Sequence, residues 1–217
     1  MQPRASSQTV YRNVLSLLLV CVLARGATAV RAEDDDGAED NWRAGFRVVI
    51  QVPIADAETR RVRRAVDRWL SKKAEAAQRP ILVLEFQSGT TAGEAGEAGE
   101  FGSAFDLATY LTSPSVGRVQ TVAYLPDVVT GHAVLAAMAC EQIIMKAEAE
   151  LGDAGKTGQV VMQTHRAAYL EIAARRGTIP AAVALGMLDS ALTVYRLEMI
   201  EGGTRYALGD ELSLIHI

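Results

Sequence analysis

The turn Thr130-Gly131-His132 lies in the segment LPDVVTGHAVLAAMACEQIIM, which runs from residue 125 to residue 145. An apolar strand is predicted before this turn, and a helix of small residues is predicted after it. Hydrolases commonly place a nucleophile at such a turn, because backbone amides at the helix start can stabilise an oxyanion. A hydroxyl is a weak nucleophile unless a base takes its proton, so Thr130 and His132 are the residues to weigh.

Each of these residues also has a simpler interpretation. A threonine just before a helix is most often an N-cap, so we expect Thr130 to cap the helix. His132 falls in the first helical turn, where the helix dipole disfavours a charged imidazole but leaves a neutral base possible. We interpret His132 as a surface or cleft histidine. His165 lies in a second predicted helix, and we expect it to face solvent.

Apolar runs typical of strands alternate with helical patterns along most of the chain. The chain closes with a predicted hairpin formed by residues 192–200 and 204–208, and a short helix starts at Pro180. This alternation predicts an α/β fold with a mainly parallel sheet flanked by helices, and ligands at the carboxyl ends of its strands. The predicted strands are 46–54, 81–86, 119–125 and 142–145, and the predicted helices are 56–78, 101–111, 131–140 and 160–175.

A second loop is expected at the same edge of the sheet. Residues 87–100 read QSGTTAGEAGEAGE, with Ala-Gly-Glu three times in succession. This composition is too small and too polar to pack a core, so we predict that Thr90 to Gly99 are mobile without a ligand.

The N-terminus has the pattern of a secretion signal. Arg4 and Arg12 precede the apolar run Val14–Ala24, and the small residues of ATAVRA follow it. Arg25 ends the apolar run too early for a membrane span, which needs about 20 residues. We therefore predict that residues 1–32 are a signal peptide and that the protein is secreted, periplasmic or bound to the cell-envelope membrane.

Composition limits the partners of the chain. The formal net charge of −4 becomes −8 when the four arginines of residues 1–32 are removed, which argues against nucleic-acid binding. Residues 33–45 contain an acidic run and are expected to be a solvated spacer. Cys140 is then the only cysteine left, so a buried thiol is expected. No Cys/His cluster has metal-ligand spacing, and no metal or cofactor is predicted.

The last six residues, LSLIHI, match one translated frame of a common sequencing-transposase end sequence. We expect residues 212–217 to be a non-native tail and residues 46–211 to form a domain that is truncated there. The alternative is an ordinary amphipathic strand.

The order of segments in this chain resembles the Clp-protease/crotonase fold. The segments are a strand, an amphipathic helix, ILVLEF with its Gly-containing loop, VAYL, a small-residue helix and ACEQIIM. Within that fold it is most similar to the membrane-associated serine peptidases of the NfeD and signal peptide peptidase A type. The resemblance covers residues 46 to 190. ACEQIIM is similar to the family ending "small-small-Asp-x-Ile-hydrophobic", and AELGDAG at 149–155 resembles the stretch that follows it.

The resemblance implies a serine at the helix start, a lysine base further along and an oxyanion hole that includes a Gly-Gly loop. The serine position falls on Gly131, or on Thr130 after a one-residue shift. The lysine position falls near Val161, and Lys156 is the nearest lysine. The Gly-Gly pair falls within the oxyanion and substrate loop Ser88-Gly89-Thr90, where only Gly89 matches.

Because these parts depart from the family pattern, the expected function is that of a catalytically degenerate homologue. It would bind a peptide or protein partner, form homo-oligomers and associate with a membrane through its signal region or a missing C-terminal part. One alternative is an active peptidase that uses Thr130 with His132 or Lys156. Another is a crotonase-like protein that binds an acyl thioester.

Overall fold

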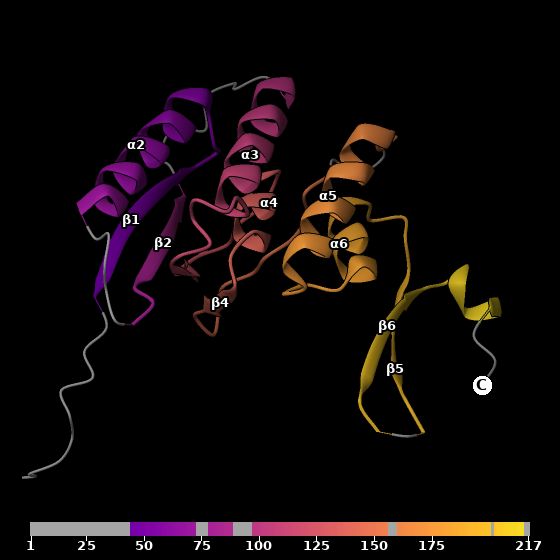
Figure 1. The fold of residues 1–217 in the computed structure, drawn as a ribbon. Helices are drawn as coiled ribbons and strands as arrows, with labels where there is room; N and C mark the ends of the chain where they lie inside the picture. Colours follow the sequence, from indigo (N-terminus) through magenta and orange to yellow (C-terminus); the bar gives the residue numbers. More distant parts are fainter. Residues whose placement is uncertain (1–43, 73–77, 89–96, 156–159, 201, 215–217) are drawn as a thin grey trace, which may run out of the picture. The chain divides into compact units, whose positions relative to one another are not determined.

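The computed structural model describes residues 44–72, 78–88, 97–155, 160–200 and 202–214. They all belong to the unit Arg43–Ile217. The predicted signal peptide, the spacer up to residue 43 and Lys156 lie outside the described residues. The elements follow one another as β1 Gly45–Val52, α2 Asp56–Lys72, β2 Ile81–Ser88, α3 Glu97–Leu111, β3 Gln120–Leu125, α4 Ala133–Met138, β4 Gln142–Met145, α5 Gln163–Arg176 and α6 Ala181–Leu188 (Figure 1).

Strands β1 to β4 form one parallel sheet in the order β1-β2-β3-β4. The register places Ile50 beside Phe86 and Leu84 beside Ala123. This confirms the predicted α/β class and the predicted neighbours among the first three strands. Because the strands are parallel, the ends of β2, β3 and β4 meet at one edge of the sheet.

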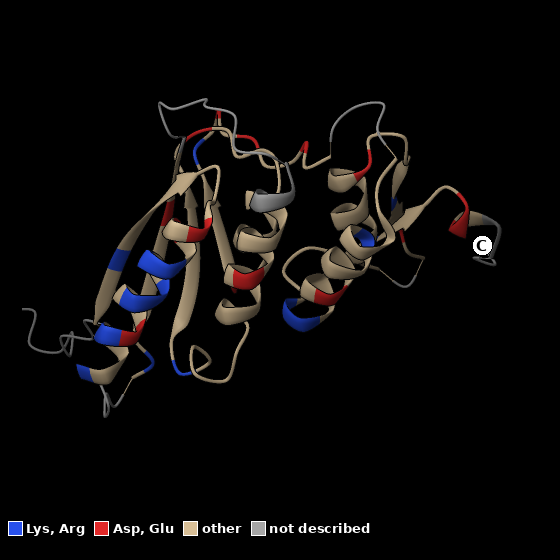
Figure 2. Cartoon of the chain, turned by 90° about the horizontal axis from the view of Figure 1, so that it is seen from above, with Lys and Arg blue, Asp and Glu red and all other residues tan. Residues whose placement is uncertain are grey.

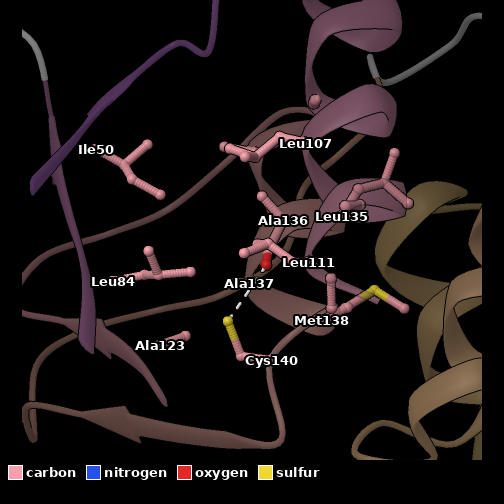
Figure 3. Close-up of a cluster of buried hydrophobic side chains, with 14 of the residues drawn as sticks. Ile50, Leu84, Leu107, Leu111, Ala123, Leu135, Ala136, Ala137, Met138 and Cys140 are labelled. Atoms are coloured by element: carbon pink, nitrogen blue, oxygen red, sulfur yellow. Dashed lines mark hydrogen bonds between the residues drawn. The ribbon is translucent and has the colours of Figure 1, made fainter. Parts of the chain in front are cut away.

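The core lies between the sheet and the helices that cover it (Figure 3). All six residues of α4 are buried, and α4 packs against α3 and α5. Small side chains in α4 allow this close approach of helices. Helix α2 buries Thr59, Val62, Val66 and Leu70, while its arginines lie along the outer face (Figure 2). The helix is therefore amphipathic, with its apolar side turned to the core.

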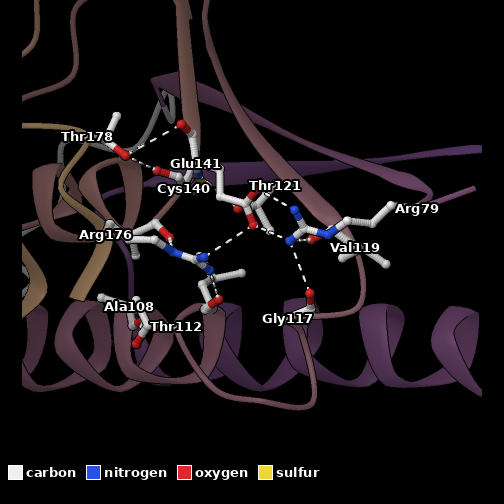
Figure 4. A network of polar contacts seen from close by, with 12 residues as sticks. Arg79, Ala108, Thr112, Gly117, Val119, Thr121, Cys140, Glu141, Arg176 and Thr178 are labelled. Atoms are coloured by element: carbon white, nitrogen blue, oxygen red, sulfur yellow. Dashed lines mark hydrogen bonds and ion pairs between the residues drawn. The ribbon is translucent and has the colours of Figure 1, made fainter.

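A polar network joins the end of α5 to the chain around β3 and β4 (Figure 4). The Arg176 guanidinium donates to the Ala139 carbonyl oxygen at 2.6 Å and to the Leu111 carbonyl, and pairs with Glu141 at 3.2 Å. Glu141 also accepts from Arg79 at 2.5 Å. The Thr178 hydroxyl donates to the Cys140 carbonyl at 2.8 Å. These contacts satisfy carbonyl groups at the ends of α3 and α4.

Several predicted boundaries change. The helix predicted at 131–140 covers only Ala133–Met138, and the one predicted at 160–175 covers Gln163–Arg176 and ends at left-handed Gly177. Helix α3 begins at Glu97, so residues 97–99 of the segment predicted to be a mobile loop are helical. Residues 89–96 of that loop lie outside the described part of the chain.

The predicted C-terminal hairpin is confirmed. It consists of β5 Val194–Glu198 and β6 Thr204–Leu208, paired antiparallel, and it packs on α6. The 3-10 helix η1 follows at Glu211–Leu214. Leu212 to Leu214 are therefore not a strand, which was the alternative for the tail, and residues 215–217 lie outside the described residues.

Among the residues that the structure describes, no helix has the length and apolar character needed to cross a membrane.

Candidate active-site turn

The turn after β3 is held by the segment AELGDAG, residues 149–155. Val129 and Leu151 form a parallel bridge, in which the Val129 amide donates to the Glu150 carbonyl at 2.8 Å. The Gly152 amide donates back to Val129 at 3.2 Å, and the Gly131 amide donates to the Asp153 carbonyl at 3.1 Å. These backbone hydrogen bonds position the candidate site along the segment from Glu150 to Asp153.

Gly131 has a φ angle of 63°, in the left-handed region. Residues other than glycine rarely adopt this backbone conformation, although a Cβ added at Gly131 would meet no atom within 4 Å. The obstacle to a serine here is therefore the backbone angle and not the surrounding space. Sharp turns of this kind are where α/β hydrolases present a nucleophile, but glycine supplies no reactive atom.

Thr130 does not cap the helix, which corrects our expectation. The N-cap of α4 is His132, and its side chain makes no capping hydrogen bond. The Val134 and Leu135 amides instead donate to the carbonyl groups of Gly131 and His132, at 3.3 and 3.0 Å. The left-handed turn at Gly131 separates Thr130 from the first helical amides, so the threonine side chain is left exposed.

His132 lies in a cluster of rings, hereafter the ring cluster, formed with Phe101 from α3 and His165 and Tyr169 from α5. The His132 and His165 ring centroids are 4.9 Å apart, and the Phe101 ring lies 5.1 Å from His132 and 4.0 Å from His165. His132 Nδ1 lies 3.4 Å from the Tyr169 hydroxyl. The expectation that His165 faces solvent is therefore wrong, because α5 turns it toward α3 and α4.

The ring cluster favours neutral side chains. Burial, followed by the neighbouring His165, lowers the pKa of His132 to about 4. Burial also lowers the pKa of His165 and raises that of the Tyr169 hydroxyl. Each shift disfavours the charged form of its group, as desolvation requires. At neutral pH His132 is thus uncharged, and an uncharged imidazole can accept a proton as a base. Its Nδ1 atom, however, faces the Tyr169 hydroxyl.

Of the other predicted site residues, Ser88 and Val161 are described. Ser88 ends β2, where its backbone pairs with Val52, whereas Gly89 and Thr90 lie outside the described residues. Val161, near the position where the resemblance implies a lysine, is partly buried and packs against the apolar core. Among the described residues, no group of three or more His, Cys, Asp or Glu side chains could hold a metal ion.

Sequence reasoning missed two members of the ring cluster. Tyr169 follows His165 by four residues, so both share one face of α5, and this spacing was a usable signal. Phe101 had no comparable signal, because its contact with the histidines depends on how α3 packs against α4 and α5.

Comparisons with known proteins add no assignment, since no protein-family model and no curated protein matches the sequence.

Proposed function

We propose that this chain is a Clp-like, NfeD-type peptidase homologue that binds an extended peptide or a protein partner at the Gly131 turn without cleaving it. The parallel order β1-β2-β3-β4 with a helix between successive strands is compatible with this fold. The turn between β3 and α4, and the ladder from Val129 to Asp153, support the same assignment.

The observation that carries the proposal is the position of Gly131. It occupies the strand-to-helix turn with a φ angle of 63° and no side chain, where the resemblance calls for serine. The nearest imidazole, His132, is directed to Tyr169 at 3.4 Å. No hydrogen bond in the described residues joins His132 to Thr130, so His132 does not serve the Thr130 hydroxyl as a base in this arrangement.

Binding is supported by the surface beside the turn. Ile144 and Met145 of β4 are 52% and 41% exposed, and Val128 in the turn is 43% exposed. In the described part of the chain, β4 is the last strand of its sheet. An exposed apolar edge strand can accept an extended peptide by backbone pairing, with pockets for alternate side chains.

The proposal also includes export through residues 1–32, association with the envelope membrane and self-association of the chain. The acidic balance of the sequence supports a peptide or protein partner over nucleic acid. N-terminal sequencing of the exported product should find Glu33 or a residue near Val30, and an intact Met1 would contradict the export step.

Fluorescein-labelled casein tests binding and cleavage in one preparation. We expect its fluorescence polarisation to rise on addition of the protein, with no fragments on a gel and no labelling of the protein by a fluorophosphonate probe. Ile144→Asp should weaken binding about tenfold or more, because it places a charge on the apolar edge. Leu170→Asp, at an exposed apolar position of α5, is the matched control and should bind normally.

Two outcomes would contradict the proposal. Casein that gives no polarisation change at any protein concentration would remove the binding role. Probe labelling and casein cleavage that are both lost in Thr130→Ala would establish the active threonine peptidase instead.

A further inference from the structure

The hairpin β5-β6 is a two-stranded sheet with little cover. Val194 and Leu208 pack with α6, but Tyr195, Met199 and Tyr206 are exposed. An isolated two-stranded hairpin is only marginally stable in water, and it gains stability from further strands or, as in part here, from packing against a helix. In the described residues no third strand pairs with either β5 or β6.

The two edges of the hairpin differ. At the outer edge of β6, the Leu208 amide already donates to the Glu211 side chain at 2.9 Å, so η1 occupies part of that edge. On β5, the Met199 amide donates to Gly203 and the Gly209 amide donates to Thr193. Hydrogen-bonded pairs alternate along an antiparallel ladder, so the backbone groups of Arg196 and Glu198 point away from β6.

From its second residue onward, β5 and the residue after it read Tyr195-Arg196-Leu197-Glu198-Met199. Leu197 is flanked by two residues of opposite charge, Arg196 and Glu198. The next residue on each side, Tyr195 or Met199, has a large apolar side chain. A segment of this kind is complementary to itself when it is turned by a two-fold rotation. Such a rotation generates the isologous interface that is commonest in homo-oligomers.

We propose that β5 pairs antiparallel with β5 of a second copy of this chain, across a two-fold axis at Leu197. The pairing joins two hairpins into one four-stranded sheet, in the order β6-β5-β5-β6. It does not depend on what binds at the Gly131 turn, so the two proposals can fail separately.

This register uses the backbone N–H and C=O groups of β5 that point away from β6. Arg196 exchanges both backbone hydrogen bonds with Glu198 of the partner subunit, and Glu198 does the same with Arg196 of the partner subunit. The side chains of each such pair carry opposite charges and lie directly opposite each other, which stabilises a sheet. Leu197 faces Leu197 of the partner subunit, and Tyr195 faces Met199 of the partner subunit.

Strand β6 offers no equivalent pairing. An axis at Arg205 would place two arginines opposite each other, which is destabilising. An axis at Tyr206 would place Thr204 opposite Leu208 of the partner subunit, whose amide is already bonded to Glu211. The self-complementary charges are therefore specific to β5.

Sedimentation equilibrium with charge-exchanged variants tests the register. We expect a dimer for the unmodified chain. Arg196→Glu or Glu198→Arg alone should raise the dimer Kd by about tenfold or more, because each places two like-charge pairs across the axis. The double variant Arg196→Glu, Glu198→Arg restores opposite charges at both pairs and should dimerise like the unmodified chain.

A cysteine at the axis gives an independent readout. Residues of a non-hydrogen-bonded antiparallel pair have Cα atoms about 4.5 Å apart, within the range of a disulfide. In a Cys21→Ser background, Leu197→Cys should oxidise to a covalent dimer, whereas Arg205→Cys, its neighbour on β6, should remain monomeric on a non-reducing gel.

The proposal is overturned by a monomeric chain at high concentration. It is equally overturned by a dimer that is insensitive to both single charge exchanges and does not cross-link through Leu197→Cys, since that dimer would use another surface.

Discussion

The imidazole of His132 lies against that of His165, with ring centroids 4.9 Å apart. His132 is the N-cap of α4, and His165 lies in the first turn of α5. Phe101 contacts both rings, and the Tyr169 hydroxyl lies 3.4 Å from His132 Nδ1. The surroundings are aromatic, and protonating either histidine places a charge among them. The ring cluster should therefore make the protein sensitive to acid.

The free energy of unfolding should fall as the pH drops from about 6.5 to about 4. The pKa of His132 is near 6.5 in the unfolded chain and about 4 in the folded one, so the unfolded chain binds more protons between these values. After a discount for its partial exposure, we expect a loss on the order of 1–2 kcal/mol from this group.

His132→Gln, which cannot be protonated, should remove this part of the acid sensitivity. Urea unfolding at pH 7 and at pH 4 measures it in both proteins. An unchanged difference between the two pH values in the variant would show that His132 does not titrate as described.

Gly131→Ala should destabilise the protein by about 1–2 kcal/mol, because alanine must adopt the left-handed φ of 63°. Gly102→Ala is the matched control, since Gly102 is an exposed residue within α3 with no atom near its added Cβ. That change should stabilise the protein by about 0.5–1 kcal/mol. Equal effects at the two positions, measured by urea unfolding, would argue against the turn geometry.

Arg176→Ala should cost about 2–3 kcal/mol, because it leaves the Leu111 and Ala139 carbonyl groups without this donor and leaves Glu141 with Arg79 as its remaining partner. Arg175→Ala removes the adjacent arginine, whose pairing with Glu171 is exposed, and should change stability by less than about 0.5 kcal/mol. Thermal unfolding of both variants checks the contrast, and similar values would show that the polar network contributes little.

Cys140 should resist alkylation while the protein is folded. Its side chain is fully buried, and burial raises the pKa of its thiol to about 12. In a Cys21→Ser background at pH 8, iodoacetamide should modify it at least about 10²-fold more slowly than in urea. Adding Arg175→Cys supplies an exposed thiol as a control, and fast modification of Cys140 itself would disprove the burial.

Gly131→Ser alone should remain unlabelled by a fluorophosphonate probe, because His132 faces the Tyr169 hydroxyl and Val161 is not a base. Gly131→Ser with Val161→Lys supplies both groups at the positions that the resemblance implies, and weak labelling is expected. Labelling of the single variant as strong as that of the double variant would show that His132 can already serve as the base.

Most elements of the fold could be predicted from local patterns. The continuous apolar run at 81–86 became β2 between two other strands, as expected for a strand covered on both faces. Gly177 ends α5, and the Glu-Gly-Gly sequence joins β5 to β6. The site was predicted less well. Its turn was located, but the cap at Thr130 and the solvent-facing His165 were wrong.

By itself, the sequence determined the strand and helix order, the parallel sheet class and the absence of a serine at the turn, because periodicity and residue identity act within a few residues. Only the tertiary structure decided that Gly131 is left-handed, that Phe101 and His165 enclose His132, and that Arg176 binds the ends of two helices. Those features depend on how α3, α4 and α5 pack together, and contacts between residues far apart in the chain leave no local periodic signal.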